Sequence, residues 1–255
     1  MIEDIPLRGR RALVTGGGRG IGRAVAVALA RAGARVALHY ITGRDAAETT
    51  LAELAGQGHA LLAADLGDPE AATMLPARAA DELGGLDIVV NNAGIYEPHD
   101  IAGIDDHAWR QVWDRTLAVN LTGPAQVIRG AVPHLTAAGG GHVVNITSRG
   151  AYRGEPAAPA YGAAKAGLNS LTQSLAGALA SRGIHLVAVA PGWVATDMTR
   201  RYLDGPAGQD IRDQSPHGRT ATAAEVAEVV LLAVSGRADA LTGGVIDVNM
   251  ASHMR

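Results

Sequence analysis

The chain has no cysteine and no phenylalanine among its 255 residues, and one of its 22 basic residues, Lys165, is a lysine. The absence of cysteine excludes disulfide bonds, thiolate metal sites and thiol nucleophiles. The nine histidines lack a metal-binding spacing such as His-Glu-x-x-His, so we expect no metal site. Without phenylalanine, the core must be packed from small and aliphatic side chains, which suits helices lying close against a sheet.

Charge and long apolar runs are also scarce. Charged residues make up 18% of the chain and the net charge is −3, which gives no electrostatic basis for binding nucleic acid. The apolar runs are short and interrupted by glycine, asparagine or arginine, so we expect no membrane-spanning helix. The first residues carry acids and no apolar stretch, unlike a signal peptide. These features predict a soluble, cytoplasmic protein with no nucleic-acid or membrane partner.

What is present is an alternation of short β-type runs with longer, alanine-rich helical runs. The expected strands are Arg11–Thr15, Ala34–Tyr40, His59–Asp65, Leu86–Gly94, Gly141–Ser148, Ile184–Ala190 and Gly243–Asn249. The expected helices are Gly20–Gly33, Arg44–Gly58, Asp68–Gly84, Asp106–Leu135 and Ala160–Ser181. Strands that are apolar on both faces and separated by helices indicate a parallel sheet covered on both sides.

We therefore predict an α/β fold of one domain over residues 1–255. It is a Rossmann fold, with a doubly wound seven-stranded parallel sheet and helices on both faces. The segment 193–219 mixes glycine, proline and charges, and it is expected to be irregular. It is a candidate substrate lid.

A glycine-rich turn, "TGGGRGIG" at Thr15–Gly22, joins the first expected strand to the first helix. Glycines at 16, 20 and 22 allow a sharp turn and let backbone N–H groups approach a phosphate. The helix N-terminus adds positive partial charge. This context predicts a dinucleotide pyrophosphate site, and the alternative is an ordinary tight strand-to-helix turn.

The end of the second strand bears on the choice of cofactor. An acid there would bond the ribose 2′-hydroxyl of NAD, but "HYITGR" reaches Arg44 without one. Arg19 and Arg44 could instead meet a 2′-phosphate, because guanidinium groups suit phosphate geometry. The alternative is that both arginines are solvated surface charges. We expect NADP(H), with NAD(H) as the alternative.

Five motifs resemble the short-chain dehydrogenase/reductase family, in the style of its ketoacyl-carrier-protein reductase branch, over nearly the whole chain. They are the glycine turn, "NNAG" at Asn91–Gly94, "AVNLTGP" around Asn120, the spacing of Ser148, Tyr161 and Lys165, and "PGWVAT" at Pro191–Thr196. The resemblance implies a catalytic set of Asn120, Ser148, Tyr161 and Lys165. It implies cofactor contacts from Gly16, Gly18, Arg19, Gly20, Ile21, Gly22, Tyr40, Arg44, Asp65, Leu66, Asn92, Ala93, Gly94, Tyr161, Lys165, Pro191, Gly192, Val194 and Thr196.

The residues themselves suggest how such a set works. Free tyrosine has a pKa near 10, and a nearby cation lowers it towards neutrality. Tyr161 and Lys165 are i and i+4 on one expected helix, and Pro159 places Tyr161 in its first turn, where the helix end is positive. Ser148 ends a strand and is suited to hold a substrate oxygen. The resemblance further implies that Lys165 bonds the nicotinamide ribose and that Asn120 anchors a water in a proton relay.

These features predict an oxidoreductase that transfers a hydride between NADP(H) and a carbonyl or secondary alcohol, with Tyr161 as general acid/base. The alternatives are an NAD(H)-dependent dehydrogenase on the same scaffold and a non-catalytic dinucleotide-sensing protein. The substrate is a small molecule whose identity the sequence leaves open. Candidate pocket residues are Tyr96, Arg149, Tyr152, Arg153, Glu155, Trp193, Met198 and Tyr202, although surface packing is equally consistent for each.

The C-terminus departs from the family pattern. Relatives often carry Gly-Gly after the last strand, whereas this chain ends "DVNMASHMR". That segment commonly takes part in subunit contacts. The family expectation is a homotetramer, or a homodimer, with the helices Asp106–Leu135 and Ala160–Ser181 at one interface.

Overall fold

The computed structural model describes residues 7–255, in which seven parallel strands form one sheet. The strand order is β3-β2-β1-β4-β5-β6-β7. The strands are β1 (Arg11–Val14), β2 (Arg35–Tyr40), β3 (Ala60–Ala63), β4 (Ile88–Asn91), β5 (Gly141–Ile146), β6 (Ile184–Pro191) and β7 (Val245–Val248). The doubly wound parallel sheet is therefore confirmed. The expectation that the first residues are unlike a signal peptide concerns residues 1–6, which lie outside the described range.

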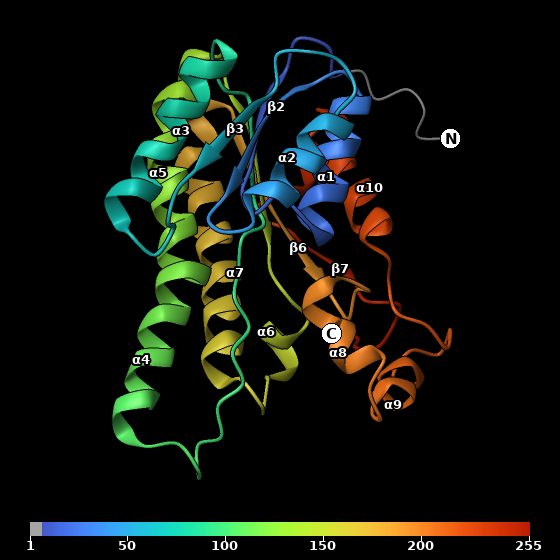
Figure 1. The fold of residues 1–255 in the computed structure, drawn as a ribbon. Helices are drawn as coiled ribbons and strands as arrows, with labels where there is room; N and C mark the ends of the chain where they lie inside the picture. The colour runs from blue at the N-terminus through green and yellow to red at the C-terminus, as the bar shows by residue number, and fades with distance from the viewer. Residues whose placement is uncertain (1–6) are drawn as a thin grey trace.

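Helices cover both faces of the sheet (Figure 1). On one side lie α1 (Gly20–Arg31), α2 (Arg44–Glu53) and α10 (Ala223–Ala233), and on the other α3 (Pro69–Leu83), α5 (Gly123–Ala137) and α7 (Pro159–Leu179). α4 (Asp106–Leu117) continues the second layer. The shorter helical segments are α6 (Gly150–Arg153), α8 (Asp197–Leu203), α9 (Gly208–Asp213), η1 (Ala118–Thr122), η2 (Ala180–Arg182) and η3 (Asp239–Leu241).

The period-two alternation of the strands explains this layering. In β1, Ala12 and Val14 pack into the core beneath α1 and α10, whereas Leu13 packs into the core beneath α3 and α5. All three are fully buried, because side chains of successive residues point to opposite faces. A strand buried on both sides needs apolar residues throughout, which is the pattern the sequence shows.

The expected helix Asp106–Leu135 is one continuous column in space but not one regular helix. Its middle turn, Ala118–Thr122, is a π-helix between α4 and α5, and α5 ends at Ala137. Asn120 lies inside this turn and is fully buried. The widened turn is typical of functional sites in helices.

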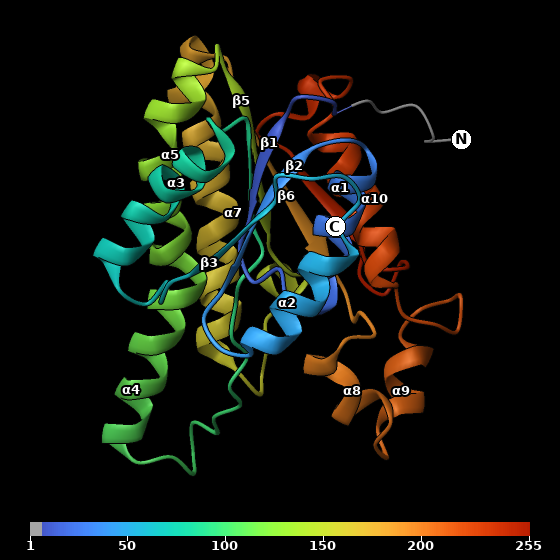
Figure 2. The same ribbon diagram turned by 45° about the horizontal axis from the view of Figure 1, so that its top comes forward.

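Two other expectations about the second half of the chain were incomplete. The segment 193–219 was expected to be irregular, but it contains α8 and α9 (Figure 2). α10 was not predicted, although its N-terminus is a capping box in which Thr222 and Glu225 bond each other's backbone N–H groups. Within residues 7–255, no helix is both long and apolar enough to cross a bilayer.

The carboxyl ends of the strands position the functional residues. β1 lies between β2 and β4, so the chain winds outward in both directions from this point. Ligands bind in doubly wound sheets at the crevice beyond the carboxyl strand ends, where the order reverses. The β1–α1 turn, the loop after β4 and Ser148 after β5 all meet at this edge.

Candidate active site

The glycine turn between β1 and α1 has the geometry of a phosphate cradle. Gly16 and Gly20 adopt φ values of +62° and +55°, which favour glycine. A Cβ at Gly22 would collide with the carbonyl oxygen of Gly16 and with the amide of Asn92. The turn therefore depends on glycine at these positions. At Gly22 the chain passes so close to the loop after β4 that no larger residue fits.

The β4 loop braces this turn. The Asn92 amide donates hydrogen bonds to the carbonyl oxygens of Thr15 (2.9 Å) and Gly16 (3.0 Å). The Thr15 hydroxyl accepts from the backbone N–H groups of Asn92 and Ala93, each at 3.0 Å. Thr15 and Asn92 thus fix the two loops to each other. The Asn92 side chain holds the glycine turn in shape through its bonds to the carbonyl oxygens of Thr15 and Gly16.

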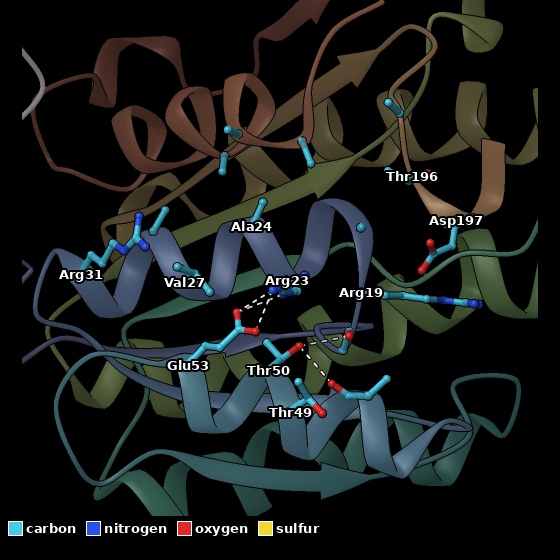
Figure 3. Close-up of a pocket in the computed structure, with 18 of the residues that line it drawn as sticks. Arg19, Arg23, Ala24, Val27, Arg31, Thr49, Thr50, Glu53, Thr196 and Asp197 are labelled. Atoms are coloured by element: carbon cyan, nitrogen blue, oxygen red, sulfur yellow. Dashed lines mark hydrogen bonds and ion pairs between the residues drawn. The ribbon is translucent and has the colours of Figure 1, made fainter. Parts of the chain in front are cut away.

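A groove of about 910 Å³ extends from the glycine turn along the outer face of α1, between α2 and α10 (Figure 3). Gly18, Arg19, Gly20 and Thr196 line it. In Figure 3, Arg23 is paired with Glu53 across the groove, at 2.7 Å. The predicted catalytic residues do not line this groove, so the larger hollow is not where the chemistry is expected.

The two arginines predicted to meet a 2′-phosphate differ in their surroundings. Arg44 bonds Glu48 through its Nε at 2.7 Å, an i,i+4 pair on the exposed face of α2. Arg19 is exposed before α1, and within residues 7–255 no hydrogen bond or ion pair of its side chain is seen. The guanidinium of Arg19 is therefore the freer of the two.

The remaining predicted cofactor residues occupy the rim of the same edge. Asp65 accepts a hydrogen bond from the N–H of Gly67 at 2.8 Å, so it shapes the turn after β3. Thr196 caps α8 in a reciprocal arrangement with Thr199. Ile21 and Tyr40 are partly buried against the core, Leu66 and Val194 are buried, and Pro191 ends β6 directly before Gly192.

Ser148, Tyr161 and Lys165 are brought together from β5 and α7. Pro159 begins α7, so Tyr161 lies in its first turn, as expected. Lys165 follows one turn later, with its Nζ 5.7 Å from the centroid of the Tyr161 ring. Its ammonium is buried and donates to the carbonyl oxygen of Ile146 at 2.8 Å.

Asn120 faces the same centre from the π-turn. Its amide donates to the carbonyl oxygen of Ile95, and its Oδ1 accepts from the Ile95 N–H, both at 2.8 Å. A Cβ placed on Gly94 would lie 3.1 Å from Asn120 Oδ1 and 3.6 Å from Lys165 Nζ. Gly94, in the loop after β4, therefore lies against both Asn120 and Lys165.

The electrostatics of the pair differ from the prediction for Tyr161. Burial raises the pKa of Tyr161 above its ordinary value, and hydrogen bonding to Ser148 acts in the opposite direction. A lowered pKa was expected from Lys165, but in the folded chain desolvation of the phenolate is the largest effect, and it raises the pKa. Burial also lowers the pKa of Lys165 to about 8, so its ammonium form still predominates at neutral pH.

A small cavity of about 80 Å³ opens beside Ser148 and Tyr161. Tyr96 packs edge-on against Tyr161 with ring centroids 5.1 Å apart, and Trp193 packs against Tyr202 at 5.6 Å. The candidate pocket residues Tyr96, Arg149, Glu155, Trp193, Met198 and Tyr202 line this cavity, whereas Tyr152 and Arg153 do not. The cavity is aromatic on one side and hydroxyl-bearing on the other.

The link between this cavity and the C-terminus was not predicted from the sequence. Arg149 donates to Ser252 Oγ and to Gln214 Oε1, each at 2.5 Å. Ser215 in turn donates to the carbonyl oxygen of Met250 at 2.7 Å. No local pattern signals a contact between residues 103 positions apart.

Comparisons with known proteins identify the family of the chain. A family model described as enoyl-(acyl carrier protein) reductase matches residues 16–251. A 3-oxoacyl-[acyl-carrier-protein] reductase, FabG, of Staphylococcus aureus is 34% identical over 247 residues, covering 96% of this chain and 98% of that protein.

Two solved structures are similar over nearly their whole length. One is a putative short-chain alcohol dehydrogenase from Sinorhizobium meliloti (TM-score 0.90, 36% identity, 97% of this chain and 98% of that one). The other is a putative 2-deoxy-d-gluconate 3-dehydrogenase from Agrobacterium tumefaciens with bound NADP (TM-score 0.87, 34% identity, 97% and 98%). The chain belongs to the short-chain dehydrogenase/reductase family of oxidoreductases.

Proposed function

We propose that the protein is an NADP(H)-dependent oxidoreductase that interconverts a ketone or aldehyde and the corresponding alcohol, with Tyr161 as general acid/base. The observation that carries the proposal is the convergence of Ser148 and Tyr161 on one cavity, with the Lys165 ammonium buried one helical turn behind.

The residues at the carboxyl edge fit a nicotinamide dinucleotide. The glycine turn has no room for a Cβ at Gly22. Its backbone N–H groups lie at the N-terminus of α1, where they are suited to bind a pyrophosphate. A side chain at Gly94 would crowd Asn120 and Lys165, so the glycine keeps both polar groups clear, and we expect the Lys165 ammonium to bond the ribose. When bound, the cofactor supplies or accepts the hydride.

Each catalytic side chain then has a definite task. The Tyr161 hydroxyl donates its proton to the carbonyl oxygen during reduction and takes it back during oxidation. Ser148 holds that oxygen by a hydrogen bond, which stabilises the negative charge developing there. Lys165 keeps a positive charge near the phenolate, and its pKa of about 8 leaves the ammonium in place at neutral pH.

The preference for NADP(H) over NAD(H) is supported by charge. β2 ends at Tyr40, and no carboxylate follows before Asp45, which lies within α2. Arg19 is exposed at the start of α1, where a 2′-phosphate would lie beyond the pyrophosphate. The similar Agrobacterium tumefaciens structure carries bound NADP.

The test is spectrophotometric. Oxidation of NADPH and of NADH is measured at 340 nm with a panel of ketones and aldehydes, and the reverse reaction with secondary alcohols. Tyr161→Phe should abolish turnover while the dissociation constant for NADPH changes by less than about threefold, because the phenol acts on the substrate. Wild-type-like turnover by Tyr161→Phe would remove Tyr161 from the mechanism. Tight NADPH binding without turnover on any substrate would favour the dinucleotide-sensing alternative.

The proposal extends to a homotetramer in which α4, α5 and α7 form one interface. Trp109 and Trp113 on α4 pack together with ring centroids 5.6 Å apart, both partly exposed on this layer. Light scattering on the purified protein tests the assembly, and a monomer would contradict it.

A further inference from the structure

Glu155 lies in the loop between α6 and α7, six residues before Tyr161, and its side chain lines the catalytic cavity. Its carboxylate lies directly over Gly150, since a Cβ at Gly150 would collide with Oε1. Burial raises the pKa of Glu155 above its ordinary value. The mechanism proposed above gives this carboxylate no task.

The Glu155 carboxylate lacks the partners that a half-buried acid usually has. Within residues 7–255 it makes no hydrogen bond and no ion pair closer than 4 Å. The nearby arginines are engaged elsewhere: Arg149 bonds Ser252 and Gln214, and Arg153 also bonds Gln214. A partly desolvated carboxylate without donors is unfavourable, so the position suits a donor brought by a ligand.

The charges around Glu155 restrict what that donor can be. Arg149 and Arg153 already lower the pKa of Glu155 from a distance, so a further cation at the carboxylate would be repelled by both guanidinium groups. An anionic group next to Glu155 would be repelled. A neutral hydroxyl group satisfies the carboxylate without either cost.

The shared cavity brings this hydroxyl close to the reacting carbon. Glu155 shares a cavity of about 80 Å³ with Ser148 and Tyr161. Its negative charge also raises the pKa values of Tyr161 and Tyr96, the two phenols that line the same cavity. A ligand hydroxyl that reaches Glu155 therefore lies in the same small cavity as a carbonyl held by Ser148 and Tyr161.

We propose that Glu155 determines substrate specificity by accepting a hydrogen bond from a hydroxyl group close to the reacting carbonyl, so that hydroxyketones and the corresponding vicinal diols are the preferred substrate class. This rests on the proposed function, because Ser148 and Tyr161 define where the carbonyl lies. A site built to bond a hydroxyl discriminates strongly against the analogue that lacks it, since the buried acceptor is then left unpaired.

The experiment compares 1-hydroxy-2-butanone with 2-butanone, reduced by NADPH. Glu155→Ala should lower kcat/KM for the hydroxyketone by about 10- to 100-fold, the loss expected for a hydrogen bond to a charged group, and change 2-butanone by less than about threefold. For the hydroxyketone, Glu155→Gln keeps an acceptor oxygen, so its kcat/KM should lie between the values of the wild type and Glu155→Ala. Glu97→Ala is the matched control, because Glu97 adjoins Tyr96 but lies outside the cavity lining. Equal losses for both ketones, or an unchanged ratio, would overturn the proposal.

A binding measurement separates this inference from the proposed function. In the presence of NADP⁺, 1,2-butanediol should raise the melting temperature of the wild type more than 2-butanol does, and Glu155→Ala should remove the difference. If the diol effect depends on Glu155 but no ketone is reduced, the hydroxyl contact at Glu155 stands, while the proposed function fails and the substrate preference fails with it. If diol and mono-alcohol act alike in the wild type, the inference fails whatever the turnover.

A pH profile excludes a merely structural role. Because the negative charge of Glu155 raises the pKa of Tyr161, Glu155→Gln should move the midpoint of 2-butanol oxidation to lower pH. Glu97→Gln should leave it in place. An unshifted midpoint in Glu155→Gln would mean that the carboxylate does not face the catalytic phenol, and would overturn the proposal.

Discussion

Lys165 donates a hydrogen bond from its ammonium to the carbonyl oxygen of Ile146 at 2.8 Å, which joins α7 to the last residue of β5. The lysine side chain is 4% exposed, and its carbonyl partner lies two residues before Ser148. One bond therefore positions the cation and braces the strand end that carries the serine. A chain that uses arginine for its other 21 basic residues keeps a lysine at this place.

Lys165→Arg should impair the enzyme although it conserves the charge. A planar guanidinium is larger than an ammonium, and the space beside Nζ is limited by Gly94 and by the Tyr161 ring. We expect kcat/KM to fall by about 100-fold or more, because a charge-assisted bond is lost and Tyr161 is displaced. Steady-state kinetics test this against Arg182→Lys, an exposed exchange in η2 that should have no effect. Kinetics of Lys165→Arg close to wild type would contradict it.

The titration of Lys165 can be followed directly, because the chain has no other lysine. Protein labelled with ¹³Cε-lysine should give one lysine resonance, with a midpoint near pH 8 rather than 10.5. Burial disfavours the ammonium, which shifts the equilibrium towards the neutral amine. A midpoint above about 10 would contradict the prediction.

The same shift makes the free energy of unfolding depend on pH. Between pH 8 and 10.5 the unfolded chain holds the lysine proton and the folded chain releases it, so the unfolded state binds more protons and stability rises with pH. From pH 7 to 9.5 the wild type should gain about 2 kcal/mol relative to Lys165→Met, which lacks the titrating group. Urea unfolding at the two pH values measures this difference, and an unchanged or reversed difference would exclude a depressed pKa.

Selectivity between NADPH and NADH should depend more on Arg19 than on Arg44. Arg19 is free to meet a 2′-phosphate, whereas Arg44 is paired with Glu48 at 2.7 Å. Arg19→Ala should weaken NADPH binding by about 10- to 100-fold and NADH binding by much less. Arg44→Ala should have a smaller effect of the same sign, and Glu48→Gln, which releases Arg44, should strengthen NADPH binding.

Fluorescence titration of both cofactors checks these variants. Arg31→Ala is the control, since Arg31 lies on the same helix at the far end of the groove in Figure 3. Equal losses for NADPH and NADH in Arg19→Ala would remove the argument for NADP(H).

Much of the architecture could be predicted because it rests on local patterns. The strands are short apolar runs, and glycine, proline and the serine–tyrosine–lysine spacing mark the turns and the site. The capping box at Thr222 and Glu225 is equally local, so α10 could have been predicted and was overlooked. The fold therefore follows from patterns of period 2 and 3.6 along the chain.

The parts that the sequence does not reveal depend on tertiary contacts. The π-turn places Asn120 so that its amide bonds both backbone groups of Ile95, in a different loop. The raised pKa of Tyr161 depends on how many atoms surround it after folding. Such features follow from packing between distant segments, and no spacing within one element encodes them.

The last turn of the chain is strained at two residues that follow β7. Met250 and Ala251 have φ values of +55° and +56°, in the left-handed region that disfavours residues with a Cβ. This turn directs Ser252 towards Arg149, next to Ser148. Because Ala251 is exposed, its substitution changes the backbone preference without removing core contacts.

Ala251→Gly should therefore leave stability unchanged or raise it by up to about 1 kcal/mol, because relief of left-handed strain offsets the greater freedom of glycine in the unfolded chain. Ala138→Gly is the matched control: Ala138 is also exposed, but its φ of −78° suits alanine, so glycine there should cost about 0.5 to 1 kcal/mol. Urea unfolding of the two variants beside the wild type measures both values. Equal destabilisation would mean that the turn at Ala251 is not left-handed in solution, and Ser252 would then have no fixed path to Arg149.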